Sequence, residues 1–196
     1  MANASYSPLG DIPLAPGATI MRRADATDHR VTEERPALDV MTDFATVDAV
    51  RVPPNVPIDA ALEQMKSSGV RLLFVASSGD ELLGVITSRD IESEKPMRFQ
   101  REIGVTRADV LVRDIMTPRD SLEVLRLDDV RHARVGDIVA TLKNMGRQHA
   151  IVVDAVGTNM RVCGLFSTTR ISRQLGVRLE VAETARTFSE IEAALR

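Results

Sequence analysis

The sequence predicts a mixed α/β (α+β) protein in which two β-α-β-β-α repeats pack as a pseudo-twofold pair. Three observations predict it: an amphipathic helix pattern occurs twice, two short apolar strands follow each copy, and each second strand leads directly into another helix. With 196 residues, the chain suffices for one large domain or two small units around a shared core. Each unit alone carries a small sheet, so we expect the two to bury their faces against each other.

The first repeat begins with a short strand at residues 50–52. A helix over residues 58–69 follows, because apolar side chains fall at i, i+3, i+4 and i+7 and a glycine ends the pattern: Ile58, Ala61, Leu62, Met65 and Gly69. Apolar runs at 70–76 and 82–86 predict two strands joined by a polar turn. The next helix begins at Thr87.

The second repeat shows the same order. The helix pattern recurs over residues 135–146 with the same spacing, at Val135, Ile138, Val139, Leu142 and Gly146. Strands are expected at 148–153 and 162–166, and a helix begins after Ser167. The first strand of this copy falls within 124–130, where extra residues blur the alignment.

These repeats divide the chain into five segments: a proline-interrupted N-terminal arm (1–37), the first repeat (38–92), a partly helical linker (93–112), the second repeat (113–176) and a tail (177–196). Within the linker, Pro96 suits a helix start and Gly104 its end. A short helical turn introduces each repeat, at 39–42 and 113–118. The tail suggests a strand at 178–182 and a helix at 187–195.

Composition excludes several classes of function. The net charge of −3 and an aromatic content of 3% argue against nucleic-acid binding and against attraction to an anionic membrane. The single Cys163 and three scattered histidines form neither a zinc pattern nor a nucleophile–base pair, so we expect no metal site and no enzyme. The N-terminal residues lack a signal-peptide pattern and no apolar run could span a bilayer, which predicts a cytoplasmic protein.

One local motif combines groups that bind ligands. Gly84 lies in a strand and permits close backbone approach, and Thr87 and Asp90 follow at the start of the next helix. A carboxylate can accept hydrogen bonds from both hydroxyls of a ribose, and a hydroxyl beside free helix amides suits a phosphate. The motif alone, however, favours a capping box, in which Thr87 and Asp90 only close the helix end.

The duplication resembles a known family. Two β-α-β-β-α units, each introduced by Asp-Val-Met-Thr or Asp-Ile-Met-Thr and each closed by Gly-x-x-Thr/Ser, look like a tandem cystathionine-β-synthase (CBS) domain pair, or Bateman module, over about residues 38–176. The resemblance implies a module, often dimeric, whose two clefts take adenosine-containing ligands such as AMP, ADP or ATP. It implies no required cofactor.

The resemblance also implies roles for individual residues. Asp90 would hold the ribose hydroxyls, Thr87 would lie near ribose and phosphate, and Arg71 would point toward the phosphates. The site also takes in Gly84 and Arg89 of the same motif, and the backbone of Val50, Arg51 and Val52 would frame the adenine. For Arg71, a solvated strand residue is the equally weighted alternative, and Arg51 departs from the threonine that the family often has.

The second copy departs from the pattern. Ser167 can replace the threonine, but Arg170 stands at the position of the ribose-binding aspartate and has no hydrogen-bond acceptor. Gln148 stands where Arg71 stands in the first copy. The second cleft is therefore expected to be empty, remodelled for an anion, or filled by its own side chains.

The leading functional hypothesis is a non-catalytic regulatory module. It would sense an adenine nucleotide, and thereby the energy state of the cell, in the cleft of the first repeat and signal to a separate, unknown regulated protein. A homodimer is expected, formed by apolar helix faces that include Ile91 and Ile171. The alternative is a structural or interaction CBS protein that has lost ligand binding.

Overall fold

The computed structural model describes residues 30–156 and 159–180. Most of the predicted arm and the predicted helix at 187–195 lie outside these residues. Of the predicted strand at 178–182, only residues 178–180 are described, and they are not in a strand.

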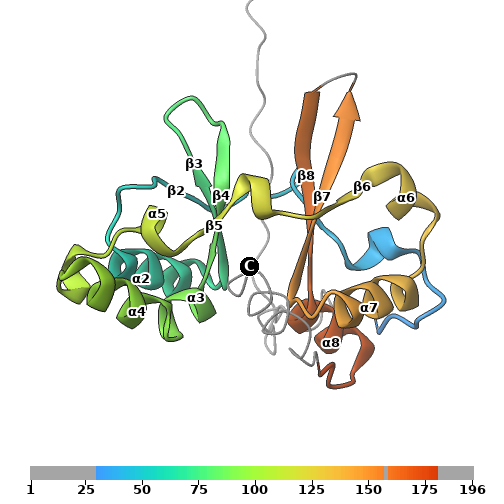
Figure 1. The fold of residues 1–196 in the computed structure, drawn as a ribbon. Coiled ribbons are helices and arrows are strands. Elements are labelled where there is room, and N and C mark those ends of the chain that lie inside the picture. Colours follow the sequence, from blue (N-terminus) through green and yellow to red (C-terminus); the bar gives the residue numbers. More distant parts are fainter. Residues whose placement is uncertain (1–29, 157–158, 181–196) are drawn as a thin grey trace, which may run out of the picture. The chain divides into compact units, whose positions relative to one another are not determined.

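Helices and short strands alternate along the described chain (Figure 1). In chain order they are η1 (Ala37–Val40), β1 (Thr42–Asp43), β2 (Arg51–Val52), α2 (Ile58–Ser68), β3 (Leu72–Ala76), β4 (Leu82–Thr87), α3 (Ser88–Glu92), α4 (Lys95–Ile103), η2 (Arg107–Asp109), α5 (Val112–Ile115), β5 (Thr117–Pro118), η3 (Arg119–Ser121), β6 (Val124–Arg126), α6 (Leu127–His132), α7 (Val135–Asn144), β7 (His149–Val156), β8 (Asn159–Ser167) and α8 (Thr168–Leu175).

The predicted helix ends are confirmed by backbone geometry. Gly69 follows α2 with a φ of 65°, and Gly104 follows α4 with a φ of 77°. Both angles lie in the left-handed region that glycine adopts without a Cβ clash. The amide of Gly69 donates to the carbonyls of Met65 and Lys66, so the last turn of α2 is closed where the apolar pattern ends.

The strands form two four-stranded sheets, one for each repeat. The first sheet has the order β2-β3-β4-β5 and the second the order β1-β8-β7-β6. In each sheet the first two strands are parallel, β2 with β3 and β6 with β7. The second of these strands then forms an antiparallel hairpin with the next, β3 with β4 and β7 with β8. The mixed fold and the repeated order predicted from the sequence are confirmed.

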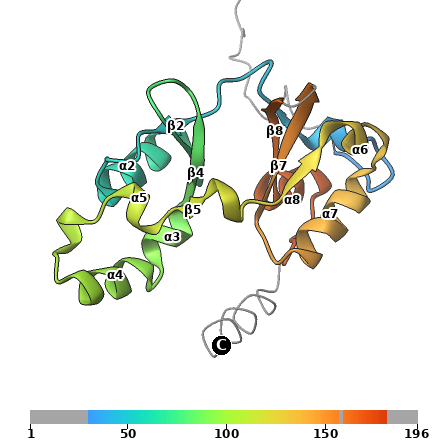
Figure 2. The same ribbon diagram turned by 45° about the horizontal axis from the view of Figure 1, so that its top comes forward.

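The segments that introduce the two repeats cross over, which the repeat alignment did not predict. β1 lies at the start of the first repeat but pairs with β8 of the second, and β5 lies at the start of the second repeat but pairs with β4 of the first. Figure 2 shows the chain after β5 passing through η3 to β6. The side chains of Ala37 and Val40 are fully buried in the core of the second repeat. The segments that begin the repeats at 38 and 113 in the sequence therefore each pair with the sheet of the other repeat.

Alternation along the central strands explains how the repeats share a face. In β3, Leu73 and Val75 pack against the helices of their own repeat, whereas Leu72 and Phe74 face the other way. The outward side chains meet those of the second sheet in a third cluster, which includes Ile151 and Val153. Period-two alternation with both faces buried requires a second layer on each side of the sheet. Each repeat thus has its own core, and the two sheets share another.

The predicted dimer residues are wrong. Ile91 on α3 and Ile171 on α8 are fully buried, each in the core of its own repeat. They close the helix–sheet packing within the chain and are unavailable to a second copy. None of the described helices is long and apolar enough to cross a membrane.

Candidate functional site

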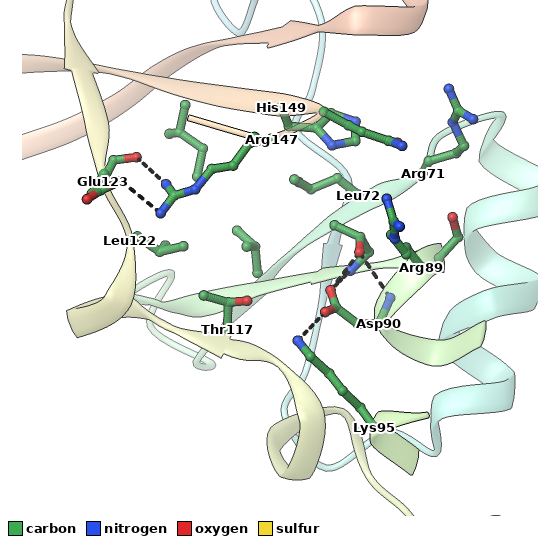
Figure 3. A pocket seen from close by; sticks show the side chains of 16 residues that line it. Arg71, Leu72, Arg89, Asp90, Lys95, Thr117, Leu122, Glu123, Arg147 and His149 are labelled. Carbon is green, nitrogen blue, oxygen red and sulfur yellow. Dashed lines mark hydrogen bonds and ion pairs between the residues drawn. The ribbon is translucent and has the colours of Figure 1, made fainter. Parts of the chain in front are cut away.

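A cavity of about 200 Å³ lies between the two repeats (Figure 3). Its first wall comes from the start of β3 and from the junction of β4 with α3, which supplies Thr87 and Asp90. Residues 146–149, which lead into β7, form the opposite wall. Thr117 and Glu123, on the segment between α5 and β6, also line it. The repeat order of the sequence thus brings the helix start of one unit against the strand start of the other.

Asp90 closes the start of α3, as the capping-box reading predicted. Its Oδ2 accepts hydrogen bonds from the backbone N–H of Thr87 at 2.9 Å and from Thr87 Oγ1 at 2.6 Å. In return, Thr87 Oγ1 accepts from the backbone N–H of Asp90 at 3.2 Å. These bonds satisfy amides that the helix start would otherwise leave unpaired. The carboxylate stays at the cavity wall, with 13% of the side chain exposed.

The other oxygen of this carboxylate carries an ion pair. Lys95, the first residue of α4, places its Nζ 2.5 Å from Asp90 Oδ1 (Figure 3). The turn between α3 and α4 brings the two together, because Ser93 Oγ donates to the carbonyl of Asp90 and accepts from the amide of Lys95. Half of the Lys95 side chain remains exposed, so its stem is free to turn.

A second ion pair lies on the opposite wall. Arg147 places its guanidinium 2.8 Å from Glu123 Oε2, and only 16% of the arginine side chain is exposed. The same guanidinium donates to the backbone carbonyl of Glu123 at 3.4 Å. This pair ties the strand start of the second repeat to the segment before β6.

The cavity is electropositive. Its lining includes four cationic side chains and two carboxylates: Arg71, Arg89, Lys95 and Arg147 against Asp90 and Glu123. His149 adds no charge near neutral pH, because burial and, secondarily, the nearby Arg71 lower its pKa from 6.5 to about 4. An excess of two positive charges in a partly enclosed site favours an anionic ligand.

The structure brings four of the predicted site residues together at this cavity: Arg71, Thr87, Arg89 and Asp90. The other six lie elsewhere: Gly84, Val50, Arg51, Val52, Ser167 and Arg170. Arg71 is exposed, immediately precedes β3 and lines the cavity at its edge.

Gly84 permits a close backbone approach, as expected, but the neighbour is another strand. A Cβ at this position would overlap the carbonyl oxygen of Thr117 and come within 3.1 Å of Pro118 Cα. Gly84 pairs with Pro118 in the register between β4 and β5. The glycine therefore lets the crossing segment close onto the first sheet.

The first-strand residues have structural contacts of their own. Val52 is buried in the core of the first repeat, and Val50 packs against the same core. Arg51 is exposed and forms an ion pair with Asp80 of the turn between β3 and β4. None of the three lines the cavity described here.

The second motif lies apart from the cavity. Ser167 precedes α8 and makes no side-chain capping hydrogen bond. Arg170 is exposed and donates to Thr42 Oγ1 of the crossing strand β1 at 3.5 Å, a long contact. The capping box of the first motif thus has no counterpart here, since an arginine cannot accept a bond from the amide of Ser167.

Sequence reasoning missed several residues of the cavity. Lys95 lies five positions after Asp90, beyond the motif, and only the turn at Ser93 returns it to the carboxylate. Arg147 and His149 come from the other repeat, and Glu123 immediately precedes β6 of that repeat. The available signal for Arg147 and His149 was the alignment of 146–149 with 69–72, which places both segments at equivalent strand starts.

The described residues contain no group of three or more metal-ligating side chains. Cys163 is partly buried against the core of the second repeat, and burial raises the pKa of its thiol. Its Sγ lies 3.5 Å from the carbonyl of Val152. This cysteine behaves as a small packing residue.

Comparison with known proteins identifies relatives of this fold. A family model described as CBS domain matches residues 37–94, and no curated protein matches the chain. The solved structure of CBSX2 in complex with AMP is 26% identical with a TM-score of 0.52, covering 71% of this chain and 94% of that one.

Two other solved structures share the fold. An uncharacterized conserved protein from Pyrococcus horikoshii is 20% identical with a TM-score of 0.54, over 78% of this chain and 100% of the other. The CBS-domain containing protein ATU1752 from Agrobacterium tumefaciens is 16% identical with a TM-score of 0.52, over 74% and 97%.

Proposed function

We propose that the chain is a regulatory module that binds an adenine nucleotide between its repeats, because a CBS-domain family model matches residues 37–94 and the fold resembles that of a solved CBS structure with AMP bound. The ligand class is AMP, ADP, ATP or another adenosine phosphate. Nucleotide binding shifts the module between two conformations that differ in affinity for a separate regulated protein. The size of this effect is limited by the difference between the nucleotide affinities of the two conformations.

The observation that carries this proposal is the carboxylate of Asp90 at the wall of an electropositive cavity. A ribose diol needs an acceptor, and Asp90, whose Oδ1 pairs with Lys95 and takes no part in the cap, lines the cavity. A phosphate needs cations, and Arg71 and Arg89 line the same space. The AMP complex of CBSX2, at 26% identity, supports the same ligand class.

A second function is favoured by a specific observation. The Asp90 carboxylate already serves a complete capping box and an ion pair, and Arg51 is paired with Asp80. This arrangement suits a structural or interaction protein that keeps the scaffold and binds no nucleotide. Nucleotide titration separates the two functions.

We expect Asp90→Ala to weaken nucleotide binding by about 1.5–3 kcal/mol, because it removes a charged acceptor for the ribose. The cap is lost as well, so stability falls by up to about 1 kcal/mol. Isothermal titration with AMP and ATP measures the affinity of both proteins.

Asp109→Ala is the matched control for this experiment. Asp109 Oδ2 likewise accepts hydrogen bonds from the backbone N–H of Thr106 at 3.1 Å and from Thr106 Oγ1 at 2.5 Å at the start of η2, but the pair does not line the cavity. This variant loses a cap and keeps its nucleotide affinity. If wild type and a folded Asp90→Ala protein bind the nucleotide with equal affinity, Asp90 only caps the helix. If wild type binds no nucleotide, the structural or interaction function is favoured.

Arg170→Asp tests why the second repeat lacks an equivalent site. Aspartate there completes a capping box with Ser167 and places negative charge at the helix start, so stability rises by a few tenths to about 1 kcal/mol. We also expect a second, weaker nucleotide site, because Gln148 replaces the arginine of the first copy. Titration measures how many nucleotides bind per chain. If the variant still binds one nucleotide per chain and is less stable than wild type, Arg170 is a functional part of the second cleft.

We propose a homodimer whose contact surface does not include the buried Ile91 and Ile171. We also propose a cytoplasmic location and a role without catalysis, in which the module acts only through the protein it regulates.

A further inference from the structure

We propose that Lys95 makes the cleft selective for phosphorylated nucleosides over the bare nucleoside. This inference rests on the nucleotide-binding function proposed above. In the structure Lys95 pairs with Oδ1 of Asp90, the oxygen that the cap does not use; on nucleotide binding Lys95 leaves that oxygen to the ribose and pairs with the phosphate.

The acceptor capacity of Asp90 is limited. A carboxylate offers about four acceptor positions. Oδ2 already takes two hydrogen bonds from Thr87, and these cannot be released without opening the start of α3. Oδ1 takes the ammonium of Lys95. A ribose diol donates two hydrogen bonds, so Oδ1 can receive both only after Lys95 moves away.

Lys95 is able to move. About half of its side chain is exposed, whereas only 13% of the Asp90 side chain is. The lysine stem has four rotatable carbons, while Asp90 is fixed by the backbone of Thr87. The ligand therefore displaces the lysine and leaves the carboxylate in place.

The destination of the displaced ammonium decides the selectivity. Adenosine offers it no anion, so the ion pair with Asp90 is lost without replacement. A phosphate monoester carries between one and two negative charges and three strong acceptor oxygens. Lys95, Arg71 and Arg89 line the same cavity, and Figure 3 shows Lys95 reaching into it from α4. The phosphorylated ligand thus restores a partner to Lys95 and the nucleoside does not.

Isothermal titration of the full chain with adenosine and with AMP tests the inference, using wild type and Lys95→Met. Methionine keeps an unbranched stem and removes the charge. We expect wild type to prefer AMP by at least about tenfold, as loss of a charge-assisted bond implies. In Lys95→Met, adenosine binds more tightly and AMP less tightly, so the preference shrinks severalfold. Lys66→Met is the control: Lys66 pairs with Glu63 on α2, away from the cavity, and its loss leaves the preference unchanged.

The outcomes separate this inference from the function on which it rests. If wild type binds AMP and Lys95→Met keeps the same AMP-to-adenosine ratio, the inference is overturned and nucleotide binding stands. If wild type binds neither compound, both are overturned. A fall in both affinities by the same factor shows a general structural role for Lys95 and also overturns the selectivity.

Discussion

We expect Gly84→Ala to lower the free energy of unfolding by roughly 3 kcal/mol, at the upper end for an overpacked core position. The added methyl group would overlap the carbonyl oxygen of Thr117, and the atoms next nearest to it are also backbone. Backbone in a paired strand cannot turn aside as a side chain can, so β5 must separate from β4. Chemical denaturation of both proteins measures the loss.

Gly164→Ala is the matched comparison. Gly164 occupies the same place in the second motif, but a Cβ there would meet Met41, with Sδ at 2.6 Å. A methionine side chain is flexible and can repack, so we expect a loss of about 1 kcal/mol. Equal losses in the two variants would contradict the assignment of Gly84 to the backbone contact with β5.

The second large effect concerns stability at acid pH. Burial, aided by Arg71, lowers the pKa of His149 from 6.5 to about 4 in the folded chain. Between these values the unfolded chain binds a proton that the folded chain does not, so stability rises with pH. As pH falls, the loss begins near 6.5 and is complete below about 4, where it reaches roughly 3 kcal/mol at 1.36 kcal/mol for each pKa unit.

His149→Leu isolates this contribution, because the aligned position in the first repeat is Leu72. Denaturation midpoints from pH 7.5 to 4 should fall less steeply in the variant than in wild type. His132→Gln is the control, since His132 is exposed on α6. Parallel curves for wild type and His149→Leu would show that protonation of His149 does not oppose folding.

The two predictions depend on contacts of different kinds. The effect of Gly84→Ala depends on the close approach of another backbone segment, which a glycine within a strand indicates. That the approaching segment is β5 could not be predicted from the sequence. His149 depends on the meeting of two repeats, because Arg71 lies far away in the chain. In the sequence, His149 was only one of three scattered histidines.

The features that could be predicted from the sequence are those that depend on local chemistry. The apolar period and the following glycines predicted α2 and its end, because both depend on neighbours within one or two turns. The spacing of Thr87 and Asp90 predicted a capping box for the same reason. Duplication of this local order was sufficient to predict two repeats.

Tertiary structure alone decided which groups share the cleft and which faces are covered. β1 and β5 cross to the opposite sheets because each sheet has an edge strand that the other repeat's introductory segment can pair with. The same packing buries Ile91 and brings Arg147 opposite Asp90's helix. Such contacts join residues far apart in the chain, and their formation depends on how two sheets bury apolar faces together, which no local pattern encodes.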